Sequence, residues 1–260
     1  MDTFNFKRFF KTFRWYFRMK RDALLKWVGM AAVATVVVEM LLIMLSGMPY
    51  SMAVKTSFAI CMSAFMIAFS VALSNIFADI RLKTKRTSLL MLPASKSEKY
   101  LCAFLYCSLI WPVATLVAFA AGDTLRMLLG ALIWKYDMIS NVSNLFGWLD
   151  NTKMGSDVMT LADVAGWTSL LWAHSLYVAC GTWFKKVPYL IATAIGLTIF
   201  FTVSYYISRH LLNRETMMIS FNETFKYGMI AFFVIAAVAN YCLSYIKFKR
   251  FEVVSGNRLN

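Results

Sequence analysis

The hydrophobic positions of this chain come in long continuous blocks rather than in the spaced stripe of a surface helix. Six blocks reach the roughly 17–25 mostly apolar residues that a helix needs to cross about 30 Å of hydrocarbon. They are residues 27–45, 54–77, 101–121, 166–184, 189–208 and 228–246. The pattern predicts an all-α, polytopic membrane protein with six transmembrane helices, ending in a short tail over residues 247–260.

Composition agrees with this prediction. Hydrophobic residues make up 60% of the 260 positions and charged residues 15%, whereas soluble domains have about 45–50% and about 25%. Two of the connections are tight hairpins, residues 46–51 and 185–188, in which Gly47, Pro49 and Pro188 end one helix before the next begins. A soluble globular protein is therefore excluded.

The net charge of +14 is explained by how the basic residues are distributed. Of the 27 Lys and Arg, 20 lie in residues 1–26, 78–100, 185–188 and the tail, and seven lie in the alternate segments. Because cytoplasmic loops are enriched in Lys and Arg, both termini are expected to be cytoplasmic. The basic excess then indicates no nucleic-acid partner. The N-terminus lacks a small-residue cleavage site, so we expect no removable signal peptide.

Residues 1–26 contain an amphipathic segment before the first span. At about 100° per residue the aromatic rings share one face and most cations share the other, with Lys20 as the misfit. The aromatic residues are Phe6, Phe9, Phe10, Phe13 and Phe17, and the cations are Lys7, Arg8, Lys11, Arg14 and Arg18. Such a helix is expected to lie in the headgroup layer. It is either a plain membrane anchor or an elbow helix that positions the first span against a cytoplasmic partner.

The longest connection is expected outside, over residues 122–165. Its apolar part, residues 125–134, is too short to cross the membrane and is expected to form an interfacial or re-entrant helix. The later outer connection, residues 209–227, is short and polar.

Soluble catalytic signatures are absent from the sequence. It contains no G-x-x-x-x-G-K-[ST] loop, no H-E-x-x-H, no G-x-S-x-G and no C-x-x-C, and it has two histidines. Its five cysteines lie in apolar stretches. We therefore expect no enzymatic activity, no metal site and no cofactor bound by this chain. Any energy source must be an ion gradient or another protein.

Two ionisable residues lie within the predicted spans, Glu39 in the first and His174 in the fourth. A carboxylate at the centre of a membrane helix costs at least about 2.5–3.5 kcal/mol, so Glu39 should face the helix bundle or a wet cavity. Counting from the span ends makes a contact between the two residues geometrically possible. They form either a substrate path or proton relay, or an ordinary hydrogen bond between helices.

The cytoplasmic loop over residues 78–100 contains a helix-start signal at the membrane edge. Pro93 ends one element, Ser95 can cap the next, and Glu98 three residues later completes a capping box. An apolar patch, residues 89–92, precedes it. The pattern indicates either a specialised short helix or an ordinary amphipathic inner loop.

At this loop the sequence resembles the permease subunits of ABC exporters of the type-2 superfamily, especially a group found in Bacteroidetes. Those proteins carry an LLLPAS..EK pattern after the second span, which here reads LLMLPASKSEK over residues 89–99. Further matches are His174-Ser175-Leu176-Tyr177, Gly181, Phe184-Lys185-Lys186, Thr193, Leu243-Ser244-Tyr245 and Lys249-Arg250-Phe251-Glu252-Val253. With six spans and cytoplasmic ends, the resemblance covers nearly the whole chain.

The resemblance implies a permease half in a bacterial inner membrane that pairs with a second half, identical or different, and docks on two separate ATPase subunits. ATP and Mg²⁺ would bind to those partners. The N-terminal helix would be the elbow, and the loop would be the coupling helix seated on the ATPase. Its coupling residues would be Leu92, Pro93, Ala94, Ser95, Glu98 and Lys99. The large extracellular domain of some exporter groups has no counterpart in residues 209–227.

Two other classes of function stay open. One is a stand-alone secondary transporter that uses Glu39 and His174 with a proton gradient. The other is a non-transporting membrane scaffold or immunity-type protein that sequesters a partner or ligand. An intramembrane hydrolase is disfavoured, because the intramembrane residues do not supply a nucleophile, a base and an orienting group.

Overall fold

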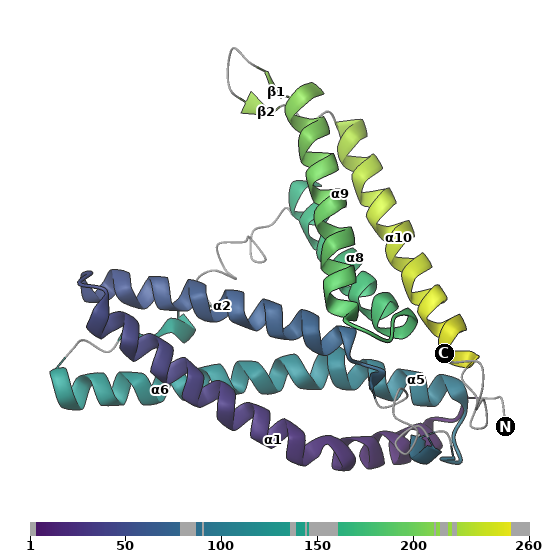
Figure 1. The fold of residues 1–260 in the computed structure, drawn as a ribbon, viewed down its shortest axis with the longest axis horizontal. Helices are drawn as coiled ribbons and strands as arrows, with labels where there is room; N and C mark the ends of the chain where they lie inside the picture. The colour runs from purple at the N-terminus through teal and green to yellow at the C-terminus, as the bar shows by residue number, and fades with distance from the viewer. Residues whose placement is uncertain are drawn as a thin grey trace. The chain divides into compact units, whose positions relative to one another are not determined.

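The computed structural model describes residues 4–78, 87–89, 91–135, 139–143, 145, 161–210, 212–213, 218–219 and 223–250. The described chain is helical apart from one two-residue strand pair, which confirms the all-α prediction (Figure 1). Its elements are α1 (Phe6–Leu45), α2 (Tyr50–Ser74), α5 (Lys96–Leu105), the π-helical turn η1 (Tyr106–Ile110), α6 (Trp111–Trp134), α8 (Leu161–Trp183), α9 (Pro188–His210), β1 (Leu212–Asn213), β2 (Met218–Ile219) and α10 (Glu223–Lys249).

The chain divides into two compact units, which are described separately. The first comprises residues 1–69 and 97–156, and the second comprises residues 70–96 and 157–260. Among the described residues, four helices are long and apolar enough to cross a membrane, as expected of a multi-pass membrane protein. They are Phe6–Leu45, Tyr50–Ser74, Lys96–Ile133 and Tyr227–Lys249.

The fourth and fifth predicted spans coincide with α8 and α9. The apolar part of α9 within the described side chains, Pro188–Val203, is shorter than a full span. Helix α8 has 23 residues but carries polar side chains such as His174 and Ser175 along its length.

Helix α1 merges two segments that the sequence analysis separates. The amphipathic segment is the N-terminal half of one 40-residue helix, which Figure 1 shows to be bowed. Asn5 starts it by accepting hydrogen bonds from the backbone N–H groups of Lys7 (3.0 Å) and Arg8 (3.2 Å). No proline interrupts the helix, which ends where Gly47 takes a φ of +62°. At 1.5 Å per residue it is about 60 Å long, twice the hydrocarbon thickness.

The third long helix runs through α5, η1 and α6 without a break and continues beyond residue 121, where the predicted third span ends. The stretch over residues 125–134, expected to be interfacial or re-entrant, is its continuation. Pro112 lacks a backbone N–H and so disturbs the helical ladder, and next to it the N–H of Trp111 bonds to the carbonyl of Tyr106 in a π-helical turn. The helix ends at Lys135, which has a φ of 54°.

Within the first unit, α1 and this third long helix run parallel, and the residues that meet are 87–90 positions apart in the chain. The two aromatic rings of Tyr16 and Tyr106 meet edge to face with centroids 5.6 Å apart. Further along, the indole N–H of Trp27 donates to the hydroxyl of Thr115 at 2.9 Å. Helix α2 adds Phe58, whose ring centroid lies 6.2 Å from that of Phe119 on α6. Aromatic contacts and close backbone approach therefore hold these helices together.

Gly122 marks the closest approach of α6 to α1. A Cβ placed there would lie 2.8 Å from the carbonyl oxygen of Ala32 and 2.9 Å from Cβ of Thr35. At Gly130, on the same helix, a Cβ would meet nothing within 4 Å. Only a residue without a side chain therefore fits at position 122 without moving the α1 backbone.

Gly122→Ala is accordingly expected to lower the free energy of unfolding by about 1–3 kcal/mol, because the new methyl group forces α1 and α6 apart. Gly130→Ala should leave stability unchanged or raise it slightly, since alanine is the better helix former. Denaturant titration of both purified variants in detergent measures the difference. Equal stability of the two variants would contradict the close packing at Gly122.

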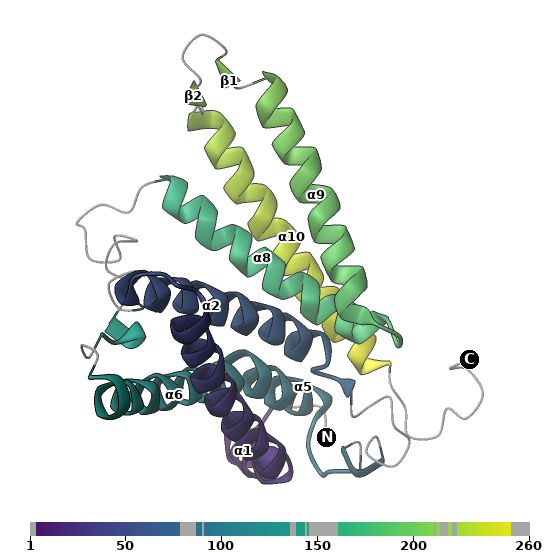
Figure 2. The same cartoon turned by 60° about the vertical axis from the view of Figure 1, so that its left-hand side comes forward.

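In the second unit, which contains α8, α9 and α10 (Figure 2), α8 packs against both α9 and α10. Short hydroxyl contacts join α8 to α10, for example Thr182 Oγ1 to Ser244 Oγ at 2.6 Å. A Cβ on Gly181 would lie 2.5 Å from the carbonyl oxygen of Ser74, so the end of α2 also packs against α8. Small residues and buried hydroxyls are the usual means of helix association in membranes.

One feature of the second unit was not predicted. Strands β1 and β2 pair antiparallel between α9 and α10, with Leu212 opposite Ile219 and Asn213 opposite Met218. The pair lies in the predicted polar connection over residues 209–227.

Candidate functional site

The first candidate site is at the start of α5, in the loop that carries the family resemblance. The helix begins at Lys96, directly after Ser95, at the position that the sequence signal indicates. Glu98 lies in its first turn and is fully buried. Its Oε1 accepts a hydrogen bond from the backbone N–H of Asn5 at 2.8 Å. Both carboxylate oxygens are also held by Arg8, from Nε and Nη2, at 2.7 Å each.

This bidentate arrangement ties the first turn of α1 to the first turn of α5. Arginine paired in this way has a fixed geometry, so the two helix ends are held in one orientation. The amphipathic pattern predicts Arg8 on the exposed cationic face of the helix and gives no sign of this pairing. Because 90 residues separate Arg8 from Glu98, no local spacing in the sequence signals the pair.

The face of α1 that packs inward therefore differs from the predicted aromatic face. Phe9, Thr12 and Tyr16 are buried at helical spacing. Among the other predicted aromatic residues, Phe6 and Phe10 are 72% and 64% exposed. Phe13 and Phe17 are half-buried, and the cations Lys7 and Arg14 are exposed. The exposed rings remain available to lipid, while the buried side packs within the first unit.

The residues to which the family resemblance assigns a coupling role differ in how exposed they are. Pro93 is exposed, and the preceding Met91 is 70% exposed. Leu92 and Ala94 are half-buried, whereas Ser95, Glu98 and Lys99 are buried. The accessible part of this motif is therefore the turn over residues 91–93.

In the second unit, the Lys96 ammonium donates to the carbonyl of Lys249 at 2.7 Å, at the C-terminal end of α10. A cation is favourable at this end of a helix because the terminal carbonyls carry partial negative charge. The first residue of α5 is thus attached to the last turn of α10.

The second candidate site is a buried polar network, hereafter the Glu39 network, near the C-terminal end of α1. Glu39 is fully buried and accepts from Arg126 Nε at 3.0 Å and from Asn141 Nδ2 at 2.5 Å. Arg126 is also fully buried, and it donates to Asp123, to the hydroxyl of Tyr50 at 2.9 Å and to a backbone carbonyl, that of residue 139, at 2.7 Å.

Asp123 extends the network to the segment that follows α6. Its Oδ2 accepts from the hydroxyl of Ser140 at 2.8 Å and from the backbone N–H groups of Asn141 (2.8 Å) and Val142 (3.1 Å). The amide of Asn141 also donates to Ser57 on α2 at 3.1 Å. One network therefore joins α1, α2, α6 and residues 139–142, and it contains two carboxylates and one guanidinium.

The sequence analysis counted Asp123 and Arg126 as residues of an outer loop. In the structure they occupy one face of α6 three residues apart, and both are fully buried. Their spacing of three residues within a long apolar stretch places both charges on one face of a helix. This pattern is compatible with a continuing membrane helix whose charges are paired with another helix. That partner, Glu39, had been considered only with His174.

His174 has a different partner in the second unit. Its Nδ1 lies 2.7 Å from the hydroxyl of Tyr241, which joins α8 to α10. Nearby, the hydroxyls of Tyr177 and Thr193 are 3.1 Å apart and join α8 to α9. Glu39 and His174 thus each contribute hydrogen bonds between helices of their own unit. The family match at the C-terminal end, Lys249-Arg250-Phe251-Glu252-Val253, includes residues 251–253, which lie outside the described residues.

Within the described parts of the chain, no group of three or more His, Cys, Asp or Glu side chains is arranged to hold a metal ion. All five cysteines are free thiols. Comparisons with protein-family models, with curated proteins and with solved structures gave no match.

Proposed function

We propose that this chain is the permease subunit of an ABC-type exporter and moves an unidentified substrate by alternating access driven by separate ATPase subunits. In this proposal α8 and α9 supply the fourth and fifth of six spans, and both termini are cytoplasmic in a bacterial inner membrane. Two permease halves, identical or different, form the transport pathway. The chain itself binds no nucleotide.

The observation that carries the proposal is the contact of Glu98 with Arg8 and Asn5. A permease must convert a push at its cytoplasmic surface into movement of its membrane helices. The exposed turn over residues 91–93 is connected to the start of α5 by Ala94 and Ser95, and Glu98 attaches α5 to α1. A force on this turn would therefore act on two long membrane helices together rather than on one loop.

The proposed cycle follows from this attachment. Closure of the ATPases on nucleotide would press on the turn over residues 91–93. The paired helices α1 and α5–α6 would then move as one body, because they are joined by Arg8–Glu98 at one end and by Glu39–Arg126 near the other. Movement of this body in each half would convert an inward-facing pathway into an outward-facing one.

The proton-coupled alternative would need Glu39 or His174 to exchange protons during transport. Glu39 is instead paired with Arg126 and held by Asn141, which favours a structural role. Transport that persists without an ATPase and stops in Glu39→Gln would restore this alternative. The scaffold alternative predicts binding of a partner or ligand with no dependence on ATP hydrolysis.

Purification of the tagged chain from its native membrane in mild detergent tests the proposal. We expect a P-loop ATPase to co-purify and to show vanadate-sensitive ATP hydrolysis. An unrelated tagged multi-span protein from the same membrane serves as the control. A chain that purifies alone, under conditions that preserve known membrane complexes, would contradict the proposal.

A further inference from the structure

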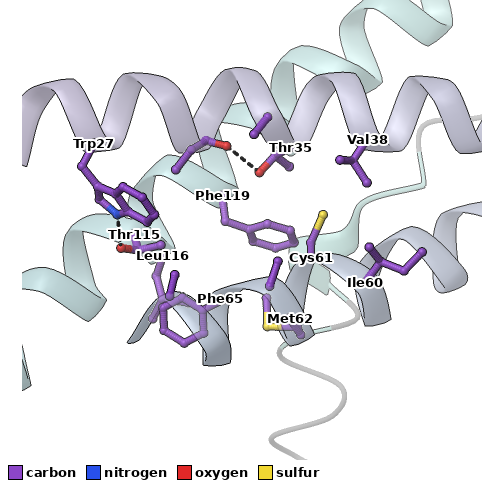
Figure 3. A pocket seen from close by; sticks show the side chains of 14 residues that line it. Trp27, Thr35, Val38, Ile60, Cys61, Met62, Phe65, Thr115, Leu116 and Phe119 are labelled. Carbon is purple, nitrogen blue, oxygen red and sulfur yellow. Dashed lines mark hydrogen bonds between the residues drawn. The ribbon is translucent and has the colours of Figure 1, made fainter. Parts of the chain in front are cut away.

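A cavity of about 160 Å³ lies within the first unit, between α1, α2 and α6 (Figure 3). Its walls are apolar, with the rings of Phe65 and Phe119 among the side chains that line it. Four alanines, at positions 31, 34, 64 and 68, leave the space that larger side chains would fill. Protein interiors are normally packed without such voids, so an occupant is expected.

The indole N–H and the two hydroxyl groups of the cavity already have partners. Trp27 Nε1 donates to Thr115 Oγ1 at 2.9 Å, and the Thr35 hydroxyl donates to the carbonyl of Ala31 at 2.9 Å. Both hydrogen bonds are drawn in Figure 3. Apolar cavities of about 150 Å³ stay dry and bind apolar molecules. The occupant is therefore a hydrocarbon rather than water or a polar solute.

The open side of the cavity faces outward between α1 and α2. Ala34 on α1 and Ile60 and Ala64 on α2 line it and are themselves exposed. Both helices are apolar enough to cross a membrane, so the surroundings of this opening are lipid chains. From Trp27 to Val38 the cavity follows α1 for about 17 Å, a little over half of the hydrocarbon thickness. A long, narrow apolar space along a membrane helix suits an acyl chain.

A cation lies beyond one end of the cavity, on the same face of α1. Lys20 precedes Trp27 by seven residues, two turns or about 10 Å along the helix. It is half-buried, and its Nζ is 5.9 Å from the centre of the Tyr16 ring. Lys20 is also the residue that does not fit the amphipathic pattern of the N-terminal segment. A cation at the membrane edge attracts anionic lipid headgroups.

We propose that this cavity is a phospholipid site that binds one acyl chain of an anionic phospholipid, with the headgroup phosphate at Lys20. The chain would fill the space between α1, α2 and α6. The proposal depends on membrane insertion and not on the transport function, so it can fail or hold independently of the ABC assignment.

Photolabelling tests the acyl-chain part. The full-length protein is placed in nanodiscs that contain phosphatidylglycerol with a diazirine in its acyl chain, and the adducts are mapped by peptide mass spectrometry. We expect adducts on the cavity-lining residues of α2, over 60–68. Ala64→Leu should reduce them about fivefold, because its larger side chain occupies the same space. Ala59→Leu is the matched control, since Ala59 is exposed and about 140° around α2 from Ala64.

The headgroup part is tested by comparing the same diazirine chain on phosphatidylglycerol and on phosphatidylcholine. We expect about threefold more cavity adducts from the anionic lipid at low salt, and a smaller ratio at high salt. Lys20→Gln should abolish this preference. Lys11→Gln removes the same charge but should keep the preference for the anionic lipid, because Lys11 is exposed on the opposite face of α1.

Three results would overturn the proposal. Equal labelling of Ala64→Leu and Ala59→Leu would mean contact with bulk lipid only. An unlabelled cavity in protein that is correctly inserted would mean that another helix or a second copy covers it. Equal labelling by the two headgroups would reject the anionic-lipid assignment. All variants are compared only after they elute at the volume of the unmodified protein in size-exclusion chromatography.

Discussion

Arg126→Gln is expected to lower the free energy of unfolding by about 3–5 kcal/mol, because it leaves two buried carboxylates without a counter-charge. Arg126 donates to Glu39, Asp123, Tyr50 and a backbone carbonyl, and water cannot replace these contacts at a fully buried position. The loss is measured as the shift of the denaturation curve in detergent. Arg14→Gln, at an exposed position of α1, removes the same charge and should have little effect.

The matched acidic substitution sharpens this prediction. The Glu39 network has a formal charge of −1, so Glu39→Gln makes it neutral while Arg126→Gln makes it −2. A glutamine at position 39 can still accept a hydrogen bond from Arg126. We therefore expect a loss of only about 1–2 kcal/mol for Glu39→Gln. If Glu39→Gln were the more damaging of the two, the network would not be held by charge compensation.

Glu98→Ala is expected to separate the N-terminal end of α1 from α5 and to uncouple ATP hydrolysis from export. Arg8 and the N–H of Asn5 lose their shared acceptor, so the first turns of α1 should open more often. Backbone amides of residues 9–16 should exchange with deuterium about tenfold faster, as for locally unfolded segments. Membrane insertion should be unchanged, because the apolar spans are intact.

A charge exchange provides the control for Glu98. In Arg8→Glu combined with Glu98→Arg, the ion pair can form again, but Asn5 no longer faces an acceptor. Protection of residues 9–16 should therefore recover in part, whereas each single substitution should lose it. Unaltered exchange in Glu98→Ala would show that this contact does not hold the two helices together. Pro93→Ala, which changes the exposed turn alone, should uncouple export without affecting amide exchange.

Local signals in the sequence predicted much of the fold. The helical class and the positions of α8, α9 and α10 follow from apolar blocks whose ends are marked by Pro188 and by polar residues. The start of α5 at Lys96 follows from Pro93 and Ser95. These features depend on neighbouring residues, so one sequence contains enough information to place them.

Long-range pairing explains what could not be predicted. The predicted third span ends at residue 121 because Asp123 and Arg126 follow, and two charges are costly in a membrane helix unless they are paired. Their partner Glu39 is 87 residues from Arg126, and Glu98 is 90 residues from Arg8. Hydropathy assigns a cost to each residue separately, so it does not include the pairing of Arg126 with both Glu39 and Asp123 in the folded chain.

The four residues of these two ion pairs also fix how α1 and the third long helix pack against each other. Their parallel register is set at the start by Arg8–Glu98, in the middle by Trp27–Thr115 and near the end by Glu39–Arg126. Buried pairs of this kind specify one arrangement of helices, because any slip along the helix axis leaves a charge unpaired. This helix pair is the part of the structure on which the proposed coupling depends.

Photo-crosslinking from position 91 tests the central claim most directly. A photoreactive amino acid replaces Met91, which is 70% exposed and lies two residues before Pro93. The adduct is identified by mass spectrometry after irradiation of native membranes. The same residue placed at Leu132, which is 80% exposed near the end of α6, is the control. We predict an adduct with a P-loop ATPase from position 91 and none from position 132. Absence of an ATPase adduct at position 91, or an equal yield from both positions, would contradict the proposed docking site.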